Sequence, residues 1–130
     1  MNINELKERL TKDLTLLKLP INEVKLCMRP YSTTYYGRYY PVYDDKRVEP
    51  KVYIYPFKSK SGVIYPYYEV LCTTIHEMVH HIQHSSSDFV RIKGVMHDPN
   101  FWKLYNHYIN RLEKLDILKE EDYEEQSITS

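Results

Sequence analysis

Two histidines one helical turn apart, with a glutamate between them, constrain this chain more than any other feature. They are His76, Glu77 and His80, within the run His-Glu-Met-Val-His. Because an α-helix rises about 1.5 Å per residue, positions i and i+4 lie on one face with their Cβ atoms roughly 5–6 Å apart. Both imidazoles can then reach one ion at the usual Zn–N distance of about 2.0–2.1 Å. We therefore expect a helix here that offers two ligands to a zinc ion.

The residues around this motif favour a helix that packs on a core. Apolar side chains recur at spacings of three and four, which is the pattern of an amphipathic helix: Leu71, Ile75, Met78, Val79 and Ile82. His76, Glu77 and His80 fall mostly off this stripe, which leaves one side of the helix for chemistry. The alternative is a chance match, and the stripe argues against it. The arrangement is that of the H-E-x-x-H zinc hydrolases.

A catalytic zinc ion normally takes three protein ligands and one water, so a third ligand is needed. A metzincin would have glycine and histidine where this chain has Gln83 and Ser86, which excludes that class. His84 continues the row on the same helix, but three ligands on three successive turns span about 12 Å. That distance is too long for one ion.

His97 is the preferred third ligand because it precedes a second helix. Asp98 is a candidate N-cap and Pro99 suits the first helical position. The helix that follows is predicted from another apolar stripe: Phe101, Leu104, Tyr105, Tyr108, Leu112 and Leu115. The remaining candidates for the third ligand are His107, Glu113 and Cys72. We interpret Cys72 as a core residue, since cysteine is among the most buried residue types.

These residues resemble those of a known family. The H-E-x-x-H run, followed by His97-Asp-Pro-Asn-Phe101-Trp102, is similar to the SprT-like zinc metallopeptidases and the related minimal gluzincin-type domains. The match covers mainly residues 65–115. Upstream of it, only the layout agrees, as a helix followed by a few strands. The sequence departs from some members in showing no recognisable zinc ribbon and no long basic extension.

The resemblance implies an α+β fold: a small zincin-like metallopeptidase domain with an N-terminal helix, a short and mostly antiparallel sheet, the H-E-x-x-H helix and a C-terminal helix. It implies one zinc ion held by His76, His80 and His97, with Glu77 as the catalytic general base. The substrate would be a protein or peptide. Some SprT-like members act on proteins bound or crosslinked to DNA, which adds DNA to the candidate partners.

The expected chemistry is peptide hydrolysis by metal-activated water, with Glu77 taking the proton. Tyr105, His107 and several upstream tyrosines are candidates for stabilising the oxyanion. A strand at 52–55 is a candidate for pairing with an extended substrate. Two other functions remain open: a peptidase dedicated to one regulatory protein, and a non-catalytic binding module in which zinc joins two helices.

Length and charge fit one domain. The chain has 130 residues and a formal net charge of zero, which gives no general argument for nucleic acid or membrane as a partner. Residues 119–130 carry one lysine against five acids, a net of −4, which leaves +4 for residues 1–118. We expect the peptidase domain to span 1–118 and the acidic tail, 119–130, to be disordered. Arg91 and Lys93 are candidates for the mouth of the site.

The cysteine content and the absence of a long apolar run indicate the compartment. Only Cys27 and Cys72 are present, and no segment resembles a signal or a membrane span. We therefore expect an intracellular, cytoplasmic protein with reduced thiols and no membrane partner.

The first half of the chain shows one helix and several strands. Leucines at helical spacing predict a helix that ends before Pro20, and alternation over 24–28 predicts a strand that ends at Pro30. Residues 35–43, interrupted by Gly37 and Pro41, suit an edge strand. A turn at 44–47 and a strand from Val52 through Ile54 toward Phe57 follow. The fourteen tyrosines are interpreted as sheet and core packing.

Overall fold

A computed structural model describes residues 1–41, 49–86 and 95–128 of the chain. These residues form an α+β fold with three α-helices, two short 3-10 helices and five short strands. In chain order they are α1 (Ile3–Leu16), η1 (Ile21–Glu23), β1 (Lys25–Met28), β2 (Gly37–Tyr40), β3 (Lys51–Ile54), β4 (Val63–Ile64), α2 (Tyr67–Ser85), α3 (Pro99–Leu115), η2 (Glu120–Tyr123) and β5 (Gln126–Ser127). The expected turn at 44–47 lies outside the described residues.

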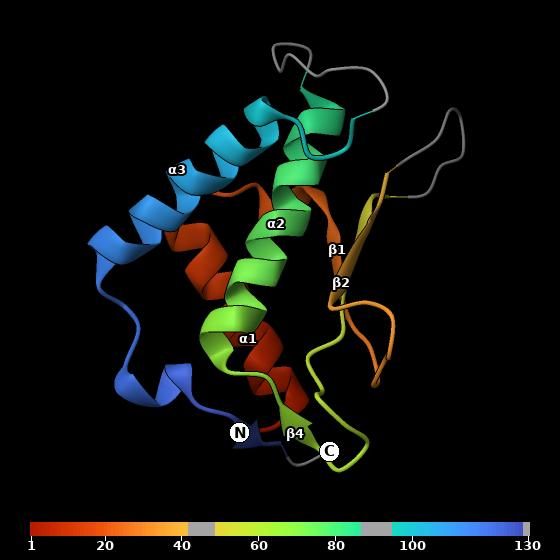
Figure 1. The fold of residues 1–130 in the computed structure, drawn as a ribbon, viewed down its shortest axis with the longest axis vertical. Helices are drawn as coiled ribbons and strands as arrows, with labels where there is room; N and C mark the ends of the chain where they lie inside the picture. Colours follow the sequence, from red (N-terminus) through yellow and green to blue (C-terminus); the bar gives the residue numbers. More distant parts are fainter. Residues whose placement is uncertain (42–48, 87–94, 129–130) are drawn as a thin grey trace.

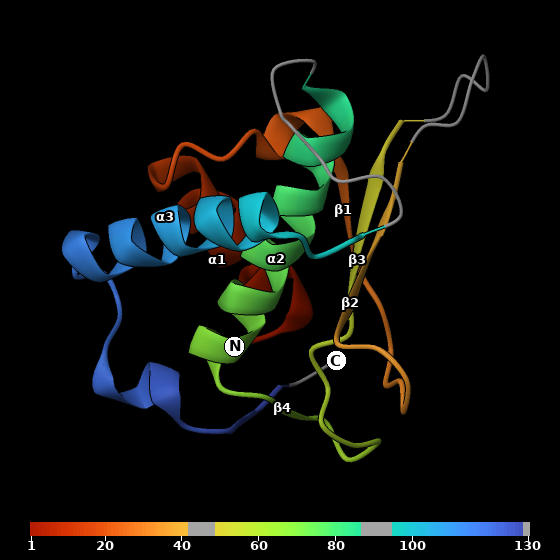
Figure 2. The same ribbon diagram turned by 45° about the horizontal axis from the view of Figure 1, so that its top comes forward.

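Helix α2 runs through the middle of the molecule. The three-stranded sheet lies on one side of it and α3 on the other, while α1 packs behind it (Figures 1 and 2). The core fills the spaces between these layers and includes the fully buried side chains of α1 and α2: Leu6, Leu10, Leu14, Leu71, Ile75, Met78 and Val79. Because α2 is covered by other elements along most of its length, its position fixes the site described below.

Helix α1 ends before Pro20, as the sequence predicted. Asn2 caps α1 by accepting a hydrogen bond from the Glu5 backbone N–H at 2.9 Å. The chain leaves α1 through Lys18, whose φ of 62° is left-handed, and the Leu19 N–H donates back to the Leu14 carbonyl. Asp116, with φ of 51°, ends α3 in the left-handed region as well. The Asn2 cap and the two left-handed residues were not predicted from the sequence.

The main sheet is mixed, which corrects the expectation of a mostly antiparallel sheet. Its strand order is β1-β3-β2, with β1 parallel to β3 and β2 antiparallel to it. Strand β3 therefore lies in the centre, and a substrate cannot pair with residues 52–54 as proposed from the sequence. Alternating apolar residues identify a strand but not its neighbours, so the strand order was not accessible from the pattern. Phe57 falls outside β3 and forms an isolated bridge to Ile64.

The acidic C-terminal segment is ordered through residue 128, so the expectation of a disordered tail was wrong. It forms η2, and β5 pairs with β4 in a separate antiparallel ribbon. Asp122 is 1% exposed, and Ile128 is buried beside the ribbon. The charged composition of this segment suggested solvation, but its partners lie more than 50 residues away in the sequence. Composition alone cannot reveal such contacts.

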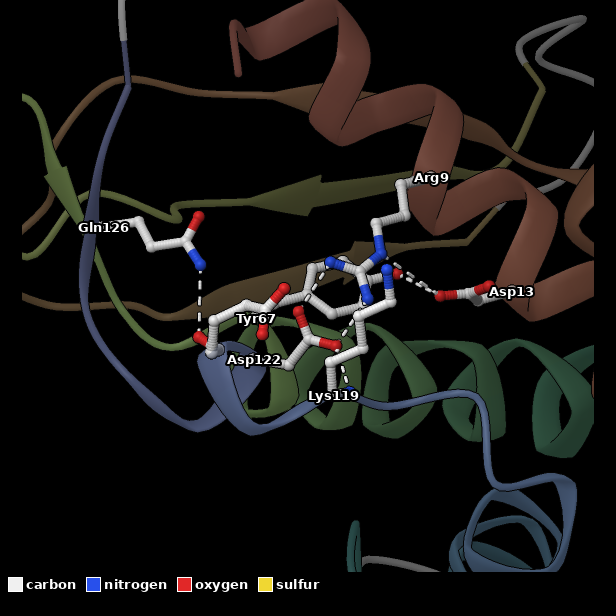
Figure 3. Close-up of polar contacts among 7 residues, drawn as sticks. Arg9, Asp13, Tyr67, Lys119, Asp122 and Gln126 are labelled. Atoms are coloured by element: carbon white, nitrogen blue, oxygen red, sulfur yellow. Dashed lines mark hydrogen bonds and ion pairs between the residues drawn. The ribbon is translucent and has the colours of Figure 1, made fainter.

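Arg9 joins this segment to the rest of the fold, and we call its contacts the Arg9–Asp122 network (Figure 3). Its guanidinium donates from Nη1 and Nη2 to the two carboxylate oxygens of Asp122, at 2.7 and 2.6 Å. The same group lies 3.7 Å above the centre of the Tyr67 ring, whose hydroxyl donates to Asp13 at 2.6 Å. The Lys119 backbone N–H also donates to Asp122, at 2.7 Å. The network connects α1, the start of α2 and η2.

The described helices were also assessed for membrane-spanning character. Among them, none combines the length and the apolar character needed to cross a bilayer.

Candidate metal centre

The three polar residues of the H-E-x-x-H motif on α2 differ in burial and in the side of the helix on which they lie. His76 and His80 are half-buried and lie on the side of α2 that meets the start of α3, while Glu77 is 7% exposed and lies on the side that meets β2. The sequence predicted one packed side and one free side for this helix. In the structure the acidic residue is buried between elements rather than solvated.

His97 reaches the pair from the start of α3. Asp98 caps this helix, since its Oδ1 accepts a hydrogen bond from the Phe101 backbone N–H at 2.8 Å, and Pro99 occupies the first helical position. The predicted helix start is therefore confirmed. Asp98 is fully buried and His97 beside it is exposed, so the buried cap fixes the backbone from which the imidazole extends.

The three imidazoles converge on one point. Nε2 of His97 lies 3.0 Å from Nε2 of His76 and 3.1 Å from Nε2 of His80, and one ligand atom from each residue lies within 4.8 Å of the others. A neutral imidazole nitrogen carries either one hydrogen or one lone pair, so the His97 Nε2 cannot form full hydrogen bonds to both neighbours. A shared cation satisfies all three nitrogens at once. These three residues can hold a metal ion.

The ring of Phe101 lies against all three imidazole rings. Its ring centre lies 4.8 Å from that of His76, 4.7 Å from that of His80 and 4.8 Å from that of His97. Its side chain is fully buried. The sequence identified Phe101 only as a core residue of the second helix. In the structure it also restricts the tilt of each imidazole and excludes solvent from one side of the cluster.

Burial keeps His76 available as a ligand. Desolvation, together with the nearby charge of His97, lowers the pKa of His76 to about 4. The imidazole is therefore neutral near pH 7, and a metal binds only the deprotonated ring nitrogen.

Glu77 is a buried carboxylate with no partner in the described part of the chain. Among the described residues, no hydrogen bond or ion pair engages it, and burial raises its pKa to about 7. The side chain packs closely against Gly37 at the start of β2. A Cβ at position 37 would lie 3.2 Å from both Cγ and Oε2 of Glu77, and 2.8 Å from Cγ2 of Thr73. Gly37 thus lets β2 approach the Glu77 carboxylate, a role that the sequence pattern did not reveal.

A cavity of about 640 Å³ opens beside His76 and Glu77. It extends from them along α2 toward the N-terminal end of that helix, and residues of β2, β3 and α3 complete its walls. Tyr105 is in its lining, with its ring centre 6.0 Å from that of His76. Tyr105, one of the residues that the sequence offered for oxyanion stabilisation, therefore lies at the site, and four of the tyrosines upstream of α2 also line the cavity. His107 is exposed and contacts Tyr108 instead.

The other candidate ligands do not join the cluster. Within the described parts of the chain, only His76, His80 and His97 form a group that can hold a metal, which leaves out His84, His107, Glu113 and Cys72. Cys72 is half-buried rather than core, beside the hydroxyls of Tyr68 and Tyr105, and burial raises the pKa of its thiol. Arg91 and Lys93 lie outside the described residues.

His81, which the sequence analysis did not single out, holds α2 in place next to the cluster. It is 3% exposed, and its Nδ1 and Nε2 lie 2.8 Å from the Tyr39 hydroxyl and from Oε1 of Glu23, respectively. These contacts tie α2 to β2 and to η1. A histidine next to His80 had no distinguishing pattern in the sequence, because its partners lie 42 and 58 residues away.

We compared the chain with models of known protein families, with curated proteins and with solved structures. None of the three comparisons gave a significant match.

Proposed function

We propose that this protein is a zinc-dependent peptidase in which His76, His80 and His97 hold the ion and Glu77 is the general base. The observation that carries the proposal is the convergence of three Nε2 atoms, two from α2 and one from the residue before the cap of α3, beside a buried carboxylate that has no partner among the described residues. A site that only joined two helices would have no use for such a carboxylate. Neutral imidazole is a favoured ligand of zinc.

Two of the three separations between the imidazole nitrogens support zinc. Two ligands of a tetrahedral zinc ion at about 2.0–2.1 Å are separated by about 3.3 Å. The separations of 3.0 and 3.1 Å between His97 and the other two imidazoles differ from that value by only a few tenths of an ångström. Three protein ligands also leave a fourth position, as in catalytic rather than structural zinc sites.

The chain's own residues supply the proton transfers. When bound, zinc polarises the scissile carbonyl and lowers the pKa of water toward about 7. Glu77 accepts a proton from the attacking water and then gives it to the leaving amine. Burial holds the pKa of Tyr105 at about 12, so its hydroxyl stays protonated and can donate to the oxyanion.

Strand β2 replaces the segment 52–55 as the candidate for substrate pairing. It lies at an edge of the three-stranded sheet, and its first residue, Gly37, packs against Glu77. An extended peptide that paired with this edge would run past the carboxylate.

The test combines metal analysis with an unfolded protein substrate. Wild-type protein should bind one zinc ion per chain, cleave labelled casein or a mixed peptide library, lose that activity on chelation and regain it with zinc. Glu77→Gln should retain the ion and lose about 10²–10⁴-fold in turnover, the usual contribution of general acid–base catalysis. Glu8→Gln is the matched control, because Glu8 is exposed on α1.

Each outcome decides between the functions. If the wild type and both variants bind zinc but none of them cleaves a substrate, the result would favour the non-catalytic module in which the metal joins two helices. Equal turnover by Glu77→Gln and wild type would remove Glu77 from the mechanism. A wild-type protein that binds no zinc would overturn the proposal.

A further inference from the structure

The cavity beside His76 and Glu77 has an unusual wall. Six tyrosines line it, and they come from the segments that precede β2, follow β3 and precede α2, and from α2 and α3: Tyr35, Tyr36, Tyr55, Tyr65, Tyr68 and Tyr105. Two acids, Glu69 and Glu77, are also in the lining, and among the described residues no lysine or arginine is. The face of an aromatic ring is negative, so rings and carboxylates together make this wall attractive to a cation.

Glu69 carries the free charge of this wall. It lies on α2 seven residues before His76, which corresponds to about 10 Å along the helix. Its carboxylate is exposed, and within the described residues no hydrogen bond or ion pair engages it. The Glu69 charge interacts electrostatically with Lys58, but the Lys58 ammonium is paired with the Glu125 carboxylate at 2.5 Å. Glu69 is thus available to a cation from outside the chain.

Tyrosine rings already bind guanidinium groups within this molecule. At the cavity itself, Arg38 lies 4.8 Å from the centre of the Tyr35 ring, and outside the cavity Arg9 lies 3.7 Å from that of Tyr67. The second of these also pairs with a carboxylate, that of Asp122. A ring face together with an acid is therefore an arrangement that this fold uses to hold a cationic side chain.

We infer that this cavity is the specificity pocket of the site and takes a lysine or arginine side chain next to the scissile bond. The apolar stem lies on the tyrosine rings, and the charged group reaches Glu69. At about 640 Å³ the cavity lies within the usual range for ligand pockets and has room for a long side chain. The inference rests on the proposed peptidase function and adds its preferred substrate, a protein segment with basic residues.

Other side chains fit this wall less well. An aliphatic or neutral aromatic side chain would contact the rings but would leave the Glu69 charge without a counter-ion. A glutamate or aspartate would be repelled by Glu69 and by the ring faces. The chemistry of the lining therefore ranks basic side chains above neutral ones and acidic side chains last.

Peptides that vary at one position test this ranking. Quenched peptides would carry Lys, Arg, Met, Phe or Glu at each position that flanks the cleaved bond, and kcat/KM would be measured for each. At one position we expect Lys or Arg to exceed Met by about tenfold, as a cation on partly desolvated rings provides. A preference for Phe or Met at every position would overturn the inference.

Variants at Glu69 then assign the preference to this pocket. Glu69→Gln should lower the Lys-to-Met ratio of kcat/KM by about threefold, a typical effect for a partly exposed ion pair. Glu69→Lys should favour Glu over Lys at the same position. The control Glu8→Gln changes net charge equally on exposed α1 and should leave the ratio unchanged. An unchanged ratio in Glu69→Gln would also overturn the inference.

A binding measurement separates this inference from the proposed activity. N-acetyl-arginine amide would be titrated into metal-free wild type, Glu69→Gln and Glu8→Gln, with tyrosine ring shifts followed by NMR and the norleucine amide as neutral control. Saturable, Glu69-dependent binding without any peptide cleavage would refute the peptidase and keep the cation pocket. Cleavage without a basic preference would refute the pocket alone.

Discussion

Two buried carboxylates in this molecule have opposite surroundings. Asp122 is 1% exposed and receives both nitrogens of the Arg9 guanidinium, which lowers its pKa. Glu77 is 7% exposed and has no hydrogen-bond or ion-pair partner among the described residues, so burial raises its pKa to about 7. A paired acid stabilises the fold, whereas an unpaired one costs stability and is free to exchange a proton. The difference separates a part of the fold that serves stability from the part that we propose serves chemistry.

The largest expected effect is on stability at the Arg9–Asp122 network. Asp122→Ala should lower the free energy of unfolding by about 3 kcal/mol, the low end for breaking a buried pair, because the Arg9 side chain is itself 25% exposed. Urea unfolding of the metal-free protein measures it. Glu77→Gln should not lower the free energy of unfolding at pH 8, since it removes a buried charge without a partner. Similar losses in both variants would contradict the comparison.

The contribution of the Arg9–Asp122 pair to the free energy of unfolding should depend on pH. The folded pKa of Asp122 is lowered from an ordinary value of 3.8, so the folded state binds its proton less tightly than the unfolded chain. Its stabilisation is complete above about pH 3.8 and is lost as the pH falls through the folded pKa. The difference in unfolding free energy between wild type and Asp122→Asn should therefore be constant from pH 7 to 5 and shrink below 3.8. A difference that grows on acidification would contradict this assignment.

The affinity for zinc tests the other side of the comparison, the region of Glu77 and the three histidines. His97→Ala should weaken zinc binding by at least about 100-fold. Even the loss of a residue that only hydrogen-bonds to a metal-ligating side chain lowers metal affinity by about 10–100-fold. The exposed His97 side chain contributes little to the metal-free fold, so the urea midpoint without zinc should not change. Competition with a chelating dye measures the affinity. His107→Ala, an exposed change on α3, is the control, and equal affinities in the two variants would remove His97 from the site.

The smallest effect concerns two glycines with different roles. Gly37→Ala places a Cβ 2.8 Å from Thr73 and 3.2 Å from Glu77, and Gly62→Ala strains a backbone with φ of 89°. Each should cost about 1–2 kcal/mol of stability. Only Gly37→Ala should also lower kcat per folded molecule, because of these two glycines only Gly37 contacts Glu77, the proposed general base. Equal kcat values, corrected for the folded fraction, would show that the close approach of β2 is structural alone.

Features set by neighbouring residues could be predicted from the sequence. The helix around the H-E-x-x-H motif and the helix that begins at Pro99 both follow from periodic apolar residues and from the Asp98 cap. The spacing of His76 and His80 placed both on one face, and the structure brings His97 to them. The identity of the ion and the reaction remain predictions.

Contacts between distant residues account for what the sequence did not show. The strand order depends on which strands meet, and the tail depends on Arg9, which lies 113 residues from Asp122. Glu77 is buried because Gly37 admits β2, although the helical pattern placed that residue on an open side. The tyrosines were interpreted as packing, and their gathering around one cavity beside His76 required the folded chain.

The ring of Phe101 has a consequence for ion selectivity. Its ring centre lies at nearly the same distance from the centres of all three imidazoles, so it hinders their movement into one plane. Copper(II) binds nitrogen ligands more strongly than zinc in general but favours square-planar geometry, whereas zinc has no such preference. Copper(II) should therefore exceed zinc in affinity by less at this site than at a flexible set of three imidazoles. We expect this because Phe101 supports the three rings.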